Sequence, residues 1–457
     1  MSFADTIVAV STPPGVGAIS IIRLSGATAC QIVERLFKPS RKEAGNTWLK
    51  THKATHGYLE DKEACERIDE VVVTAFLEPH SYTGEDLLEI SCHGSPVVTR
   101  KILELCLKLD ARLAKPGEFT ERAYLAGKID LTQAEAVLDL IQAKTSYQSK
   151  LALSALSGEL GRQIKAIRQG LIQLLTTIVA GIDFPEEVGE MPEPDIEKIV
   201  TESILQLNKL AKTASSGKFL REGLRIAIVG RPNAGKSSLL NHLLKYERAI
   251  VTDIAGTTRD ALEEFLDING IPVILVDTAG IRHTEDQVEK IGIERSKRAI
   301  EDSHLVLLLV DITAGWGEQE VHIAELIGQK PVILLKNKID LGVVPEIENN
   351  LNPVAELLIS AKTGSGIEEL GQAIELWVFA GGNLSDTGAS LNARQAELCQ
   401  KALAGLNLVQ QTVANGMPQD CLASDLKITI DALSEICGEM VTEEVISSVF
   451  ANFCIGK

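Results

Sequence analysis

Gly230-Arg-Pro-Asn-Ala-Gly-Lys-Ser237 is the stretch of this sequence that decides the fold. It matches the pattern GxxxxGK[ST], and it lies between an apolar, strand-like run at 224–229 and a helix-like stretch at 238–244. In that context, glycines let backbone N–H groups surround phosphates, and the N-terminus of the following helix adds positive potential. The pattern predicts a nucleotide-binding loop in which Lys236 neutralises phosphate charge and Ser237 ligates Mg²⁺.

Apolar runs of strand length recur downstream of this loop, separated by stretches of helix length. Such alternation predicts a mostly parallel sheet with helices on both faces. The runs occupy residues 224–229, 273–276, 305–310, 332–335 and 357–359.

Polar motifs follow three of those runs. Asp277-Thr-Ala-Gly280 can hold the Mg²⁺ shell and offer an N–H to the γ-phosphate of a nucleotide. Asn337-Lys-Ile-Asp340 supplies a carboxylate that can accept from both N1–H and N2–H of guanine, and a site that pairs those donors rejects adenine strongly. Ser360-Ala-Lys362 can contact the base. In this order, the motifs resemble those of the P-loop GTPases.

The segment 251–260 contains threonines, and one of them can complete the Mg²⁺ shell when γ-phosphate is present. Ras-type GTPases place a water-orienting Gln where this chain has Ile281, so catalysis needs another device. Asn233, together with residues 256–260, resembles GTPases that pair through their G domains and bind K⁺ in place of an arginine finger's charge. A simple turn-forming role for Asn233 is the alternative.

The regions outside the α/β part have a different pattern of apolar residues. Residues 1 to about 115 mix short strand-like runs with turns and predict an α+β domain, whereas 118–182, 196–211 and 391–453 have helical spacing. We expect an N-terminal domain at 1–117, the first part of a helical domain at 118–219, an inserted GTPase domain at 220–380 and the second helical part at 381–457. Two helical domains in series are the alternative.

Composition limits the function classes. The chain has 457 residues, a net charge of −18 and eight cysteines, none in a CxxC pair, which leaves zinc and thioredoxin-like chemistry without support. Nothing predicts a membrane span or signal peptide, so we expect a cytoplasmic protein without membrane contact.

An acidic protein needs a partner or a local basic patch to bind RNA. One candidate patch, with ordinary solvated helix faces as the alternative, contains Arg100, Lys101, Lys108, Arg112, Lys115, Arg122 and Lys128.

Short motifs that carry a closer resemblance are spread over the whole chain. They are Asp5–Ala9, Thr12–Gly15, Ile22–Gly26, Tyr82–Asp86, Cys92–Gly94, Arg112–Phe119, Ala180–Pro185 and Phe453–Lys457. Together they resemble the tRNA modification GTPase MnmE (TrmE) family. The resemblance implies a multidomain α/β protein: an N-terminal α+β domain that binds folate and forms a homodimer, and an all-α domain into which a Ras-like P-loop GTPase domain is inserted.

The resemblance also implies a reaction and partners. Members of the family work with the flavoprotein MnmG (GidA), in a heterotetramer or larger complex, on C5 of the wobble uridine (U34) of certain tRNAs. They add an aminomethyl or carboxymethylaminomethyl group, and a 5,10-methylene or 5-formyl tetrahydrofolate derivative supplies the one-carbon unit. The chain has no GxGxxG fingerprint, which agrees with FAD residing in the partner.

Residue roles follow from the same resemblance. The GTP-binding set is Asn233, Ala234, Gly235, Lys236, Ser237, Ser238, Thr252, Asp253, Ile254, Ala255, Gly256, Thr257, Thr258, Asp277, Thr278, Ala279, Gly280, Asn337, Lys338, Asp340, Ser360, Ala361 and Lys362. Mg²⁺ is assigned to Ser237 and Thr258, and K⁺ to Asn233, Thr252, Ile254 and Thr257. The catalytic set is Glu289, which positions water indirectly, Arg259 and Arg282, which order the switches, and Cys454, which the modification needs. Folate is assigned to Arg23, Glu89, Lys128 and Lys457.

Two competing functions remain at this point. A ribosome-assembly GTP switch of the Era/EngA type has a similar G domain, but such proteins usually carry a basic RNA-binding domain or a second G domain. A GTP-dependent scaffold without chemistry is the other possibility, and it would require Cys454 to be dispensable.

Overall fold

The computed structural model describes residues 5–41, 48–189, 191–246, 264–276, 289–342, 349, 351–379 and 390–457. Two compact units divide the chain. The terminal unit comprises residues 1–138 and 434–457, and the central unit comprises residues 139–433. The contacts therefore group the last 24 residues (434–457) with the first 138, and the four expected domain boundaries stay a prediction.

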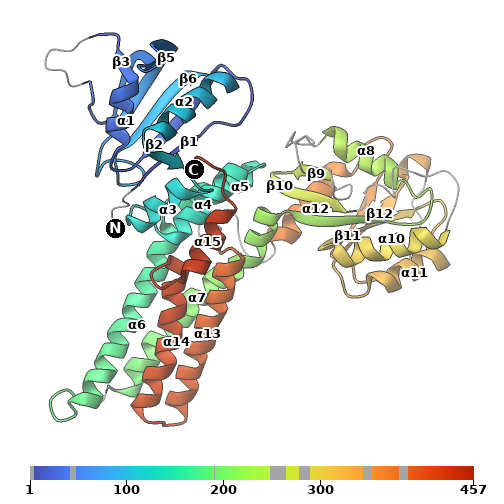
Figure 1. The fold of residues 1–457 in the computed structure, drawn as a ribbon. Coiled ribbons are helices and arrows are strands. Elements are labelled where there is room, and N and C mark those ends of the chain that lie inside the picture. The colour runs from blue at the N-terminus through green and yellow to red at the C-terminus, as the bar shows by residue number, and fades with distance from the viewer. Residues whose placement is uncertain are drawn as a thin grey trace. The chain divides into compact units, whose positions relative to one another are not determined.

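A seven-stranded sheet forms the body of the terminal unit (Figure 1). Its strands are β1 (Thr6–Val10), β2 (Ile19–Ser25), β3 (Phe37–Pro39), β4 (Lys53–Asp61), β5 (Glu66–Phe76), β6 (Leu87–His93) and β7 (Ala111–Leu113), in the order β3-β4-β5-β6-β2-β1-β7. The β1–β7 pair is parallel and the other pairs are antiparallel. Alternate residues such as Ile22, Val73 and Ile90 pack against helices α1 (Ala29–Leu36) and α2 (Pro96–Lys108), as a one-faced antiparallel sheet requires.

Residues 453–457 return to the start of the same unit. After α3 (Glu118–Leu125), α4 (Leu131–Gln142) and α15 (Glu443–Ala451), Ile455 pairs with Pro116, and Phe119 N–H donates to the Lys457 carbonyl at 3.1 Å. Gly456 has φ 93°, and a Cβ there would lie 2.6 Å from the Val10 carbonyl oxygen, so this close approach requires glycine.

One part of the central unit consists of helices. They are α5 (Ser146–Leu156), α6 (Glu159–Asp183), α7 (Glu193–Glu222), α13 (Ala393–Ala414) and α14 (Gln419–Cys437, whose last turn belongs to the terminal unit). Figure 1 shows α6, α7, α13 and α14 side by side. Ile164, Ile167, Leu171, Leu174 and Ile178 form the buried stripe of α6 at helical spacing, which explains why this segment packs as an amphipathic helix.

The other part of the central unit contains a six-stranded sheet. Its strands, in the order β13-β12-β11-β8-β10-β9, are β8 (Leu224–Val229), β9 (Glu264–Ile268), β10 (Ile271–Val276), β11 (Leu305–Asp311), β12 (Val332–Asn337) and β13 (Ala355–Ile359). Helices α8 (Lys236–Tyr246) and α12 (Ile367–Phe379) pack on one face, and α10 (Glu289–Asp302) and α11 (Glu318–Ile327) pack on the other. The expected doubly covered parallel sheet is confirmed.

One strand departs from the parallel pattern. β9 pairs antiparallel with β10 through the turn Asn269-Gly270, where both residues have positive φ. An Asn-Gly pair between two strands is the strongest short hairpin signal, but sequence reasoning did not use it. In sequence, the strands of this sheet come after α7 and before α13, and these two helices pack against each other. The α/β domain is therefore inserted into the helical one.

Candidate functional site

The loop between β8 and α8 follows its backbone path because of two glycines. Gly230 has φ 150°, and a Cβ there would lie 2.5 Å from the Leu309 carbonyl oxygen. Gly235 has φ 105°, and its Cβ would lie 2.2 Å from Asn337 Nδ2. Asn233 also has a left-handed φ of 63°, which Asn tolerates better than most residues. The predicted phosphate loop therefore has the tight backbone that its pattern requires.

Lys236 folds back over this loop. Its Nζ donates to the carbonyl oxygens of Gly230 and Arg231 at 2.7 and 2.8 Å. Burial lowers the pKa of Lys236 to about 8, because carbonyl dipoles replace water around the ammonium group without supplying a counter-charge. A phosphate group in the loop would supply that charge, so the site is arranged to receive an anion.

Asn337 connects three parts of the site. Its Nδ2 donates to the Ala234 carbonyl at 2.7 Å, and its Oδ1 accepts from the Ala361 N–H at 2.9 Å. The side chain is only 2% exposed. Asn337 therefore ties the phosphate loop, the end of β12 and the loop after β13 into one rigid arrangement.

Asp340 lies in a 3₁₀ turn, η1 (Ile339–Leu341), directly after Asn337 and Lys338. Its Oδ1 accepts from the Ser360 hydroxyl at 2.7 Å, which fixes the carboxylate from the neighbouring loop. Two of the motifs predicted to bind the base, 337–340 and 360–362, are thus joined by direct hydrogen bonds in the structure.

Sequence reasoning missed Asp311, the last residue of β11. Lys338 Nζ donates to Asp311 Oδ2 at 2.6 Å, and Arg231 Nη2 lies 3.3 Å from the same oxygen. Burial opposes ionisation of Asp311, but hydrogen bonds from Lys338 and Thr313 outweigh it and lower its pKa to about 2. A lone carboxylate ending a fully apolar run was the signal that could have identified this residue.

The carboxyl ends of β8, β11, β12 and β13 bring these groups to one edge of the sheet, where parallel α/β folds bind ligands. The remaining predicted groups, at 252–259, 277–280 and Arg282, lie outside the described residues. Glu289 begins α10, but its side chain is outside them as well. The described part of the site therefore covers the predicted phosphate loop and the motifs predicted to bind the base, with Ser237 and Ser238 in the first turn of α8 and Lys362 exposed beside Ala361.

A second polar site lies in the terminal unit. Arg23 on β2 bonds Glu89 on β6, with Nη2 and Nε 2.6 and 3.0 Å from Oε1. The Arg23 guanidinium also donates to the Gly456 carbonyl at 3.2 Å and lies 5.6 Å from the centre of the Phe119 ring. The structure thus places Arg23, Glu89 and the Gly456-Lys457 backbone together, and it adds Phe119, which sequence reasoning missed.

The other residues predicted for this site are arranged differently. Lys128 donates to the Pro79 carbonyl, on the segment that leads to Tyr82. Lys457 contributes its carbonyl to the Phe119 N–H, and Cys454 is exposed. The exposed Cys454 therefore lies two residues before the Arg23 contact at Gly456.

Carboxylates occupy much of the candidate basic patch. Arg122 is fully buried, with Asp5, Glu85 and Glu118 within 3.0 Å of its guanidinium. Arg112 bonds Asp5 and Glu118 at 2.6 and 2.5 Å. These two arginines hold the start of β1 against α3 and are not available to phosphates. Lys101 is likewise paired, with Glu66 at 2.5 Å.

Within the described ranges, no helix combines the length and apolar character needed to cross a membrane.

Comparisons with known proteins cover the whole chain. Residues 6–128 match the family model "GTP-binding protein TrmE N-terminus", and residues 131–454 match "MnmE helical domain". Two curated proteins named tRNA modification GTPase MnmE are similar along their full length. The protein from Acetivibrio thermocellus is 43% identical and that from Aquifex aeolicus 44%, with 99% of this chain covered in both and 99% and 100% of the relatives.

A crystal structure of Era with MgGDPNP and ribosomal RNA is also similar, at 32% identity over 33% of this chain and 55% of that one. Its TM-score of 0.25 is too low to support a structural argument.

Proposed function

Because the chain belongs to the MnmE (TrmE) family of tRNA modification GTPases, we propose that its GTP hydrolysis drives modification of the wobble uridine, U34, in a complex with the flavoprotein MnmG (GidA). The chain itself is a GTP hydrolase that acts in tRNA modification. The added group is aminomethyl or carboxymethylaminomethyl at C5, and a tetrahydrofolate derivative supplies its carbon. FAD chemistry belongs to the partner.

The guanine assignment rests on one observation above all: the Asp340 carboxylate is fixed by Ser360 next to the Asn337 bridge. A carboxylate held in this way is pre-organised to accept two N–H groups from one base, and pre-organisation avoids an entropy cost on binding. Phosphates in the Gly230–Ser237 loop would contact backbone N–H groups and Lys236.

We assign Mg²⁺ and K⁺ to the phosphate loop and to residues 252–258, and two of the assigned residues, Ser237 and Asn233, are among the described ones. Ser237 lies in the first turn of α8 beside the phosphate loop, where a hydroxyl suits Mg²⁺, and Thr258 would complete that shell. Asn233 has an exposed side chain and a left-handed backbone in the loop, so its amide oxygen can face a monovalent cation. K⁺ held there with Thr252, Ile254 and Thr257 would stabilise the negative charge that develops on the phosphate in the transition state. Glu289, Arg259 and Arg282 are assigned to water positioning and switch ordering.

Folate fits the terminal unit on chemical grounds. The Arg23–Glu89 pair offers both a cation and a hydrogen-bond acceptor, and Phe119 offers a ring at the same place. A pterin carries N–H donors and a flat π-face, and its glutamate tail is anionic, so Lys128 and Lys457 suit the tail. Cys454 is assigned to the modification reaction rather than to GTP turnover.

GTP turnover in KCl and in NaCl, at equal ionic strength, tests the cation proposal. We expect much faster turnover in KCl, and Asn233→Ala should remove that difference. Equal rates in both salts would contradict the K⁺ site. Because some ribosome-assembly GTPases also respond to K⁺, a second assay must follow modified tRNA with MnmG, folate and GTP; absence of product there would contradict the U34 proposal.

Homodimer formation is part of the proposal, with the terminal unit as the pairing surface. Sedimentation of the full chain without nucleotide tests it. A monomer at micromolar concentration would contradict it.

A further inference from the structure

The connection between α6 and α7 has an unusual charge. Residues 180–197 contain seven acidic residues and no basic one. The stretch includes the motif Ala180–Pro185, to which neither GTP binding nor folate binding assigns a role. At this end of the helical bundle, negative charge is thus concentrated on a loop and two helix ends.

Large apolar side chains are exposed in the middle of that charge. Val179, Ile182, Phe184 and Val188 are 40–56% exposed although they lie within ten residues of one another. Gln419 Nε2 donates to the Met191 carbonyl at 2.9 Å, which places the start of α14 beside this loop. Several large apolar side chains exposed close together in sequence, with acidic residues between them, are typical of a protein interaction surface.

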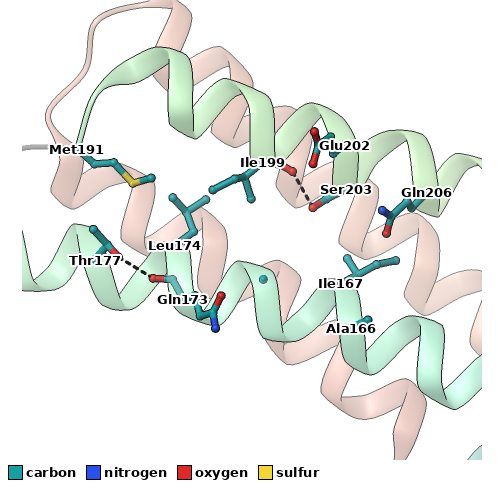
Figure 2. Close-up of a pocket in the computed structure, with 11 residues that line it drawn as sticks. Ala166, Ile167, Gln173, Leu174, Thr177, Met191, Ile199, Glu202, Ser203 and Gln206 are labelled. Atoms are coloured by element: carbon teal, nitrogen blue, oxygen red, sulfur yellow. Dashed lines mark hydrogen bonds between the residues drawn. The ribbon is translucent and has the colours of Figure 1, made fainter.

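A groove lies between α6 and α7, and Met191 of the connection between these helices lines one end of it (Figure 2). Its volume is about 320 Å³; Ile167, Leu174, Ile199 and Met191 form its apolar part. The hydroxyls of Thr177 and Ser203 bond within their own helices, at 3.0 and 2.8 Å, so they add little polarity.

Gly170 of α6 lies in the wall of the groove. A Cβ on Gly170 would meet no atom within 4 Å. The space is therefore large enough for a side chain from outside, next to the exposed carboxylate of Glu202.

Charge decides which class of partner fits. Seven acidic residues repel the phosphates of tRNA, and they also repel the same surface of a second copy of this chain. An apolar segment flanked by Lys and Arg would be attracted both by the exposed apolar side chains and by the acidic charge. Resting on the function proposed above, we propose that the connection between α6 and α7 (residues 184–189 and Met191) and the α6–α7 groove form the docking surface for the flavoprotein partner, which inserts an apolar side chain ringed by basic residues.

Substitution of the patch tests the apolar contact. The double variant Phe184→Ser with Val188→Ser should weaken binding of the purified flavoprotein to the full chain about tenfold or more, as for truncated interface anchors. Leu376→Ser, on an equally large and 73% exposed residue of α12, is the matched control and should bind like wild type. Glu186→Lys with Glu187→Lys should slow association and reduce its dependence on salt.

Gly170→Leu separates binding from folding. Leucine is the better helix former and meets open space, so the melting temperature should stay the same or rise while the affinity for the flavoprotein falls. Wild-type affinity in Gly170→Leu and in the Phe184/Val188 variant would overturn the docking proposal alone. Failure of the wild-type chain to bind the flavoprotein at all would refute both proposals. Loss of tRNA affinity in the Phe184/Val188 variant, with flavoprotein affinity unchanged, would reassign the surface to nucleic acid.

Discussion

GTP affinity should fall as the pH rises from 7 to 8.5, because the free protein loses the Lys236 proton that a bound triphosphate needs. Burial holds the pKa of Lys236 at about 8 in the free protein. A phosphate in the loop would stabilise the ammonium form and raise that pKa, since an opposite charge nearby favours the charged state. Nucleotide binding must therefore take up a proton wherever Lys236 starts out neutral.

The magnitude follows from the pKa of about 8. The apparent dissociation constant scales as 1 + 10^(pH − pKa), which gives a loss of roughly fourfold, or about 0.8 kcal/mol, between pH 7 and 8.5. The stability of the nucleotide-free protein depends on pH in the opposite direction. Its folded Lys236 binds fewer protons than the unfolded chain between pH 8 and 10.5, so this group makes the free protein more stable as the pH rises through that window.

Isothermal titration calorimetry in two buffers of different ionisation enthalpy measures both quantities. Proton uptake on GTP binding should rise from about 0.1 at pH 7 to about 0.75 at pH 8.5, as linkage requires. Guanosine, which lacks phosphates, is the control for titration of the base, and its affinity should not change in this range. A constant GTP affinity, or equal proton uptake at the two pH values, would refute the depressed Lys236 pKa.

Three further predictions concern separate parts of the chain. Asp340→Asn should shift nucleotide preference from GTP towards XTP, measured by competition binding, because the amide replaces the acceptor facing N2–H; unchanged GTP preference would refute the guanine assignment. Gly456→Ala should lower the stability of the full chain by about 1–3 kcal/mol, measured by urea unfolding, because its Cβ would clash with Val10. Gly127→Ala, at φ 69° with open space around it, is the matched control and should cost less. Cys454→Ser should retain GTP turnover and abolish tRNA modification; modified tRNA at the wild-type level would remove Cys454 from the chemistry.

The parts of the fold that sequence predicted are those with a local signature. The phosphate loop depends on Gly230, Gly235 and Lys236 within eight residues, and the parallel sheet depends on apolar runs such as β11, which is buried throughout. Both patterns are dictated by backbone geometry and burial over short distances.

The contacts that sequence could not predict join distant segments. Phe119 lies near Arg23 although 96 residues separate them, and the Gly456 carbonyl accepts a hydrogen bond from the same guanidinium only because the end of the chain returns to its start. Asp311 links Arg231 to Lys338 across three strand ends. Charge alone suggested a basic patch around Arg112 and Arg122, whereas both residues form ion pairs with Asp5 and Glu118, and Arg122 is buried.

The return of residues 453–457 to β1 also sets the order of events during synthesis. Val10 and Pro116 leave the ribosome early, but their partners Gly456 and Ile455 follow only after the whole central unit, residues 139–433, has been made. At about 5–20 residues per second, that interval is roughly 15–60 s. Throughout it, the end of β1 and the start of α3 lack their contacts with residues 455–457. The central unit can fold in this time, whereas the terminal unit can be completed only when translation has reached residue 457.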